Sequence, residues 1–133
     1  MPSTKIASKA ANALLDVEAI DVVKFGFRGL AQITGGPDPI EMIRSQYGGL
    51  WVGGTATLYE DRLEFEPNGM NRALHKGDLS ISIKLRDVDK VEQRFGILSG
   101  IIDISAGRSV LSIRTFGAKG FASQIEQARD AAR

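Results

Sequence analysis

GGTATLYEDRLEFE, from Gly53 to Glu66, begins with paired glycines and continues as two short alternating runs. The glycines fit the spacing of a phosphate-binding loop, but Gly54 stands where that loop needs a lysine that neutralises the phosphates. Leu63 and Phe65 alternate with glutamates, which is typical of a strand with one buried face. The stretch therefore predicts a β-hairpin that turns at Glu60-Asp61, with glycines that relieve crowding where the first strand begins.

Further short strands are expected on both sides of this hairpin. Strict alternation of apolar and polar residues predicts strands at 23–28 and 79–85, and another strand is expected at about 91–95. A second hairpin is expected from 101–105 and 109–116 around the turn at Gly107. The chain is therefore expected to be mainly β.

Three segments have helical patterns instead. Apolar residues recur at helical spacing over about 3–18, at Ile6, Ala10, Ala13, Leu14 and Val17, which predicts an N-terminal helical extension at 1–18. Asp38-Pro39 followed by Gly48-Gly49 predicts a short inserted helix near residues 38–47. Phe121, Ile125, Ala128 and Ala132 predict one amphipathic helix that closes the domain.

Composition limits the classes of function. The chain has 133 residues, the size of one domain over 1–133, and its 17 basic and 16 acidic residues give a net charge of +1. Because the charge is balanced, we expect no nucleic-acid partner. With no cysteine and no apolar run near the ~20 residues that span a bilayer, we expect a cytoplasmic protein without thiolate metal sites.

Two segments resemble a known family. GTATLYEDRLEF (54–65) looks like the "glycine, strand, polar turn, Arg-Leu-x-Phe" signature that opens GRAM domains, which belong to the pleckstrin-homology superfold. SIKLRDVDKV (82–91) is similar to the family's "strand, Leu-x-Asp-Ile-x-x-Val" step. The resemblance covers about 53–128 and is looser over 16–47. It implies a seven-stranded bent barrel capped by a C-terminal helix, and recognition of a membrane or of a partner.

Basic residues on the strands form the candidate recognition site. Lys24 and Arg28 share one face of the strand at 23–28, and other strands contribute the candidates Lys84, Arg86 and Arg94. Such cations would bind an anionic headgroup through charge-assisted hydrogen bonds, or would simply solvate an outer sheet face.

Trp51 is the candidate partner contact, as an exposed anchor for a partner or membrane interface; a place in the core is the alternative. The only histidine, His75, lies in a polar loop near Asp78, and we interpret it as a solvated side chain rather than a base. We therefore expect no enzyme activity, no catalytic residues, no metal and no cofactor.

The sequence thus favours a non-enzymatic intracellular recognition module of GRAM or pleckstrin-homology type. It would bind a protein partner or, weakly, an anionic membrane surface. The first alternative is a structural or self-associating domain that forms a homo-oligomer through a strand edge or the N-terminal helix. The second is a small-ligand or catalytic domain with an enclosed polar pocket around His75, or between Trp51 and the C-terminal helix.

Overall fold

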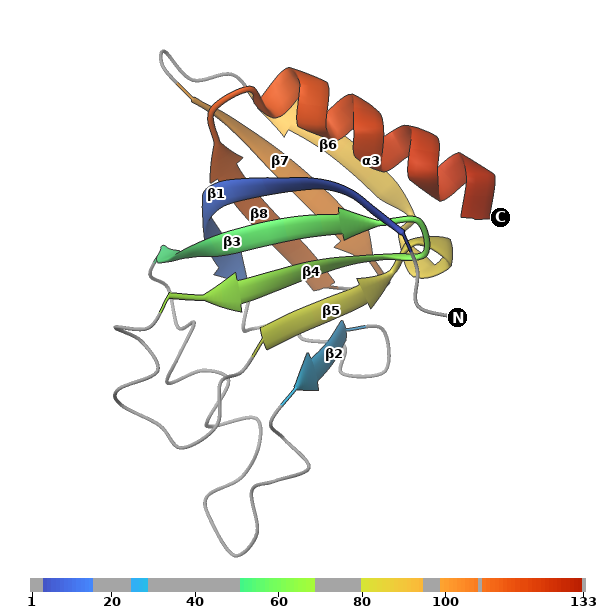
Figure 1. The fold of residues 1–133 in the computed structure, drawn as a ribbon, viewed down its shortest axis with the longest axis horizontal. Helices are drawn as coiled ribbons and strands as arrows, with labels where there is room; N and C mark the ends of the chain where they lie inside the picture. Colours follow the sequence, from blue (N-terminus) through green and yellow to red (C-terminus); the bar gives the residue numbers. More distant parts are fainter. Residues whose placement is uncertain are drawn as a thin grey trace, which may run out of the picture.

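In the computed structural model, one antiparallel sheet is followed by a C-terminal helix (Figure 1). The structure describes residues 4–15, 25–28, 51–68, 80–94, 99–107 and 109–132. Within these residues the sheet has eight strands: β1 (Lys5–Leu15), β2 (Phe25–Arg28), β3 (Val52–Tyr59), β4 (Arg62–Pro67), β5 (Ser80–Lys84), β6 (Lys90–Arg94), β7 (Gly100–Ala106) and β8 (Ser109–Thr115). A short 3-10 helix, η3 (Leu85–Asp87), follows β5, and α3 (Ala118–Ala132) ends the chain.

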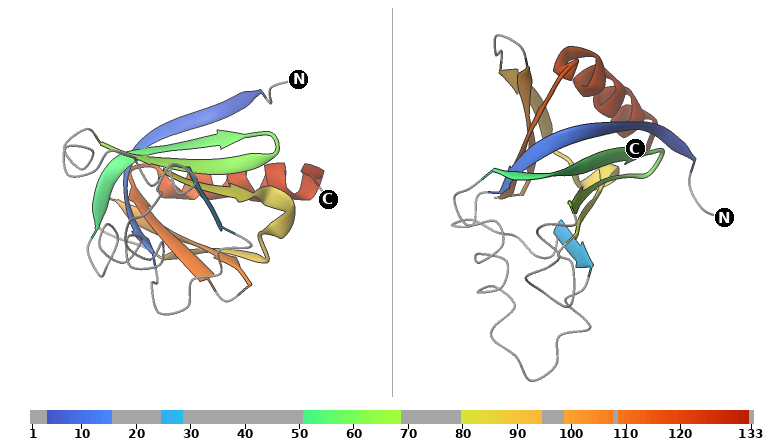
Figure 2. Two further views of the ribbon diagram at one scale, coloured as in Figure 1. Left: turned by 90° about the horizontal axis from the view of Figure 1, so that it is seen from below. Right: turned by 60° about the vertical axis from the view of Figure 1, so that its left-hand side comes forward.

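The strand β1 joins two halves of the sheet. The strand order is β2-β5-β4-β3-β1-β8-β7-β6. Residues 5–13 of β1 pair with β3, whereas residues 12–15 pair with β8. β1 therefore curves from one half of the sheet into the other, as Figures 1 and 2 show.

The core lies inside this bend and under α3. Alternate residues of the strands point inward, so Leu63 and Phe65 of β4 are fully buried. α3 packs on β6, β7 and η3, and it buries Phe121 and Ile125. Burying one such side chain contributes about 1.5–3 kcal/mol, so the helix is an integral part of the domain. The predicted C-terminal helix is confirmed.

The two predicted hairpins are confirmed. β3 and β4 pair in the register Leu58↔Leu63 around the turn at Glu60 and Asp61. β7 and β8 pair around Gly107, whose φ of 62° suits a residue without a side chain. The mainly β class predicted from the sequence is therefore correct.

The predicted N-terminal helix is wrong, because residues 5–15 form the strand β1. The alanine-rich segment has good helix propensity, but it also alternates, and Ala11, Ala13 and Leu15 face the core at every second position. β3 on one side and β8 on the other satisfy its backbone hydrogen bonds. Tertiary pairing therefore overrides the local preference.

The strand predicted at 23–28 exists over Phe25–Arg28, but it lies at an edge of the sheet rather than opening the barrel. β2 pairs with β5, in the register Phe25↔Ile83. The strand that opens the sheet is instead β1, which the sequence pattern had assigned to a helix. The inserted helix predicted at 38–47 lies outside the described residues.

Candidate functional site

The first candidate site lies where β1 passes from β3 to β8. Asn12 of β1 is paired with Gly53 on one side and with Arg114 on the other. The Thr115 hydroxyl donates to the Ala10 carbonyl oxygen at 2.9 Å, which fastens the end of β8 to β1. A groove of about 370 Å³ opens here, between these strands and the residue that follows β4.

The two glycines of the opening stretch have different structural roles. A Cβ at Gly53 would lie 3.2 Å from Asn68 Nδ2 and 3.3 Å from Asn12 Oδ1, so two side-chain amides flank this glycine in the groove. Gly54 faces inward, and a Cβ there would lie 2.2 Å from the carbonyl oxygen of Glu66 on the paired strand. The glycines therefore permit close strand packing, as the hairpin interpretation predicts, and the chain continues from them as the strand β3 rather than as a helix.

Arg114 and Trp51 form a stacked pair beside this groove. The Arg114 guanidinium carbon lies 4.6 Å from the centre of the Trp51 ring. Trp51 is half-buried, so it is neither a core residue nor a fully exposed anchor. Arg114 is exposed and forms no ion pair within the part of the chain that the structure describes. The stacking therefore holds at the surface a positive charge that no described residue neutralises.

Two of the predicted cations, Lys84 and Arg86, lie beside the C-terminal end of α3. Lys84 and Arg86 line one groove of about 360 Å³ together with Asp61 and Ala132. Both side chains are exposed, and neither forms an ion pair with another described residue. They remain candidates for anion contact, with the Asp61 carboxylate in the same groove.

Arg62, next to this groove, is compensated by acidic neighbours. Its guanidinium donates to Glu64 at 2.6 Å and to Asp61 at 2.9 Å, and it stacks over Tyr59 at 3.9 Å. The hydrogen bond to Glu64 is the main cause that raises the Arg62 pKa above its ordinary value. Arg62 therefore adds little attraction for an outside anion.

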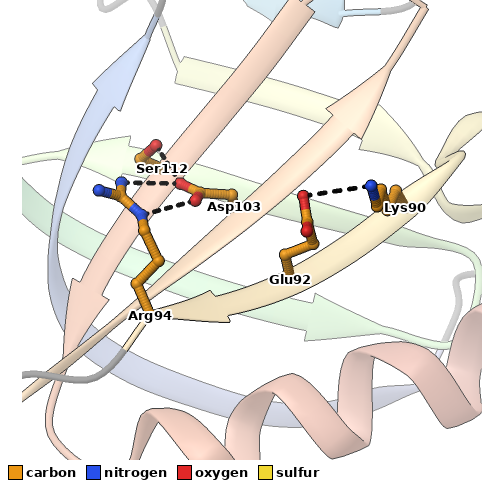
Figure 3. A network of polar contacts seen from close by, with 5 residues as sticks. All are labelled: Lys90, Glu92, Arg94, Asp103 and Ser112. Atoms are coloured by element: carbon orange, nitrogen blue, oxygen red, sulfur yellow. Dashed lines mark hydrogen bonds and ion pairs between the residues drawn. The ribbon is translucent and has the colours of Figure 1, made fainter.

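Arg94 lies on the other half of the sheet, where it is bound to Asp103 (Figure 3). Its guanidinium donates two hydrogen bonds to the Asp103 carboxylate, at 2.7 Å and 3.0 Å, and the Ser112 hydroxyl donates a third at 2.6 Å. Burial raises the pKa of Asp103, but the bonds from Arg94 and Ser112 lower it below its ordinary value. Arg94 is thus already paired, and the structure does not bring it together with Lys84 and Arg86.

The remaining predicted residues are placed only in part. Arg28 ends β2, where its backbone is paired with Ser80 of β5, and its side chain is outside the described residues. Lys24 and His75 also lie outside the described residues.

Sequence reasoning missed Arg114, Asn12 and the exposed Phe116. The alternation over 109–116 places Arg114 and Phe116 on the face opposite Ile113, and this signal was present in the sequence. However, Asn12 was assigned to a helix, so its pairing with Arg114 could not be foreseen.

The described residues offer binding groups rather than a metal centre. No three His, Asp or Glu side chains among them gather closely enough to hold a metal ion. In the same ranges, no helix has the length and apolar character needed to cross a membrane. No model of a known protein family matches this chain, and no curated protein or solved structure matches it.

Proposed function

We propose that this chain is a recognition module with a GRAM-like, pleckstrin-homology-type fold that contacts an anionic surface. The observation that carries the proposal is the architecture of the described residues. If the short strand β2 is set aside, the other seven strands form one bent antiparallel sheet, and a C-terminal helix packs against them. This arrangement agrees with the seven strands and capping helix that the sequence resemblance implies.

The surface chemistry supports binding rather than catalysis. The first groove is lined by Arg114, side-chain amides and small residues, and the second by two cations and the Asp61 carboxylate, so both offer polar groups to an anionic or polar partner. Lys84, Arg86 and Arg114 are exposed and form no ion pair with another described residue. An anionic bilayer attracts a cation by about 1 kcal/mol where that cation lies at its surface, so Arg114 and the Lys84–Arg86 pair, which line different grooves, are alternative contact sites.

Vesicle flotation tests this proposal. The protein is mixed with vesicles of phosphatidylcholine alone, or of phosphatidylcholine with phosphatidylserine, at low and at physiological salt. We expect binding that requires the anionic lipid. This binding should weaken as salt is added, because salt screens the attraction between exposed cations and the lipid headgroups. An absence of binding to anionic vesicles at low salt would refute the membrane contact and leave a protein partner as the target.

A self-associating domain is the second candidate, and one observation favours it. β6 is the last strand on its side of the sheet within the described residues, so one of its backbone edges has no neighbouring strand there. Such an edge can pair with another chain. Sedimentation equilibrium over a range of protein concentrations tests this version: a mass that rises towards twice the monomer supports it, and a constant monomer mass refutes it.

A further inference from the structure

Phe116 is an exposed aromatic residue in a turn with hydrogen bonds on both sides. Its side chain is 69% exposed, in the turn between β8 and α3. On one side of it, the Thr115 hydroxyl is bonded to the Ala10 carbonyl. On the other, Gly117 has a φ of 67° and accepts the first helical hydrogen bond, from the Phe121 amide at 3.1 Å. The phenyl ring therefore stands in water on a turn that is fixed at both ends.

Three cations lie on or beside the turn that carries this ring. Arg114 lies two residues earlier on the same face of β8, lines the same groove as Phe116, and is held against Trp51. Lys9 reaches the turn from β1, since a Cβ at Gly117 would lie 3.1 Å from its Nζ. Lys119 is exposed on the first turn of α3. We call Phe116, Arg114, Lys9 and Lys119 the Phe116 corner.

The charge of the Phe116 corner is not compensated by nearby acids in the described structure. None of its three cations forms an ion pair with another described residue, and the first turn of α3 has no acidic residue. Among the described residues that line the groove shared by Arg114 and Phe116, none is an Asp or a Glu. By contrast, the groove of Lys84 and Arg86 contains the Asp61 carboxylate, which is shared with Arg62, and the described residues that line it include no exposed aromatic ring. The Phe116 corner is therefore the better match for an anionic surface.

We propose that the Phe116 corner is the part of this protein that contacts an anionic lipid bilayer, an inference that rests on the proposed membrane contact. Phe116 enters the interfacial layer, where aromatic rings are favoured, while the three cations lie at the level of the lipid phosphates. A single protruding ring among cations suits a bilayer, since lipids rearrange around it. A protein partner, in contrast, would need a wider apolar patch around Phe116, because the centre of a protein interface is mostly apolar.

The test compares variants at the two ends of α3 in the same flotation assay. Phe116→Ser removes the aromatic ring, and Arg114→Gln with Lys119→Gln removes two charges from the corner. Lys84→Gln with Arg86→Gln removes the same charge beside Ala132. The two ends of this 15-residue helix are about 20 Å apart at 1.5 Å per residue, so the control pair lies well away from the corner.

We expect Phe116→Ser to weaken binding to anionic vesicles roughly tenfold, which is the effect of withdrawing one aromatic side chain from an apolar layer. Removing the two corner charges should weaken it about 25-fold, or about fivefold per cation, with a shallower salt dependence. The control pair lies at the alternative contact site, away from the bilayer when the corner is docked, so at physiological salt it should retain wild-type binding within about twofold. All three variants alter exposed residues, so unchanged thermal unfolding will show that they remain folded.

Trp51 provides an independent readout, since it is the only tryptophan and lies against Arg114. Anionic vesicles that contain brominated phosphatidylcholine should quench its fluorescence, and Phe116→Ser should shift this quenching to a roughly tenfold higher lipid concentration. If the wild type binds but Phe116→Ser binds equally well, or if the control pair loses the binding, the Phe116 corner is wrong and the membrane function stands. If the wild type binds no vesicle, both proposals fail.

Discussion

Replacing Gly54 by alanine tests whether the opening stretch is built for close strand packing. The new Cβ would lie 2.2 Å from the Glu66 carbonyl oxygen and 2.7 Å from Cζ of Phe65. Real Cβ contacts are essentially never shorter than 3.0 Å, so the backbone of β4 must move by about 0.8 Å. Phe65 is fully buried and cannot swing into solvent to make room.

The cost follows from these contacts. Overpacking of this kind costs about 1–3 kcal/mol. Displacing β4 also weakens at least one hydrogen bond between β3 and β4, worth about 1 kcal/mol. We therefore expect Gly54→Ala to lower the free energy of unfolding by roughly 2–4 kcal/mol, which for a domain of this size lowers the Tm by roughly 8–16 °C. Thermal unfolding followed by far-UV circular dichroism measures this shift.

Two other glycines serve as matched controls. A Cβ at Gly53 meets the ends of two asparagine side chains at 3.2 Å and 3.3 Å, and these can move, so Gly53→Ala should cost less than about 1 kcal/mol. A Cβ at Gly120 meets nothing within 4 Å, and alanine there should stabilise α3 by up to about 1 kcal/mol. A Gly54→Ala protein whose Tm lies within a few degrees of that of Gly53→Ala would refute the packing argument.

Three further predictions concern the helix and the ion pair on β6 and β7. Since the folded Asp103 pKa lies below its ordinary value, the ionised carboxylate stabilises the fold above about pH 4, and this contribution is lost as the pH falls through the folded pKa. Asp103→Asn should therefore lower stability in urea at about pH 7 and flatten its acid dependence; an unchanged acid dependence would contradict the pairing with Arg94. Phe121→Ala should cost about 3–5 kcal/mol in thermal unfolding, whereas Glu126→Ala, at an exposed position of α3, should change stability by under about 0.5 kcal/mol. Gly117→Ala forces a side chain into a φ of 67° and should lower stability by about 1 kcal/mol; a gain in stability would show that the turn has changed conformation.

The sequence predicted the elements whose pattern has a single interpretation. The alternation of Leu63 and Phe65, and of Ile102 and Ile104, fits only strands, and these side chains are buried in the structure. In α3, Phe121 and the apolar positions after it have helical spacing alone, and the helix forms there.

The segment at 5–15 has both patterns, and long-range pairing decides between them. Ala10 and Leu14 share a helical face, but Ala11, Ala13 and Leu15 share a strand face, and alanine is a weak signal for either. The strand wins because β3 and β8, about 40 and 100 residues further along the chain, supply backbone partners on both sides. No window of sequence around Ala11 contains that information.

This reassignment also changes the expected distribution of binding groups. With β1 as the shared strand, Arg28 lies at the edge next to β5, and Arg114 becomes the neighbour of Asn12. Lys84 and Arg86 lie beside the C-terminal end of α3, Arg114 beside its N-terminal end, and Arg94 is held by Asp103.

Because the cations are dispersed, their number alone cannot select a binding surface. The groups beside them make the difference: Asp61 accompanies Lys84 and Arg86, whereas the exposed Phe116 accompanies Arg114. An acidic neighbour weakens the attraction for an outside anion, and an exposed ring adds an apolar contribution that salt does not screen. A membrane contact at the N-terminal end of α3 should therefore retain part of its affinity at physiological salt, whereas a contact made by Lys84 and Arg86 alone should lose nearly all of it.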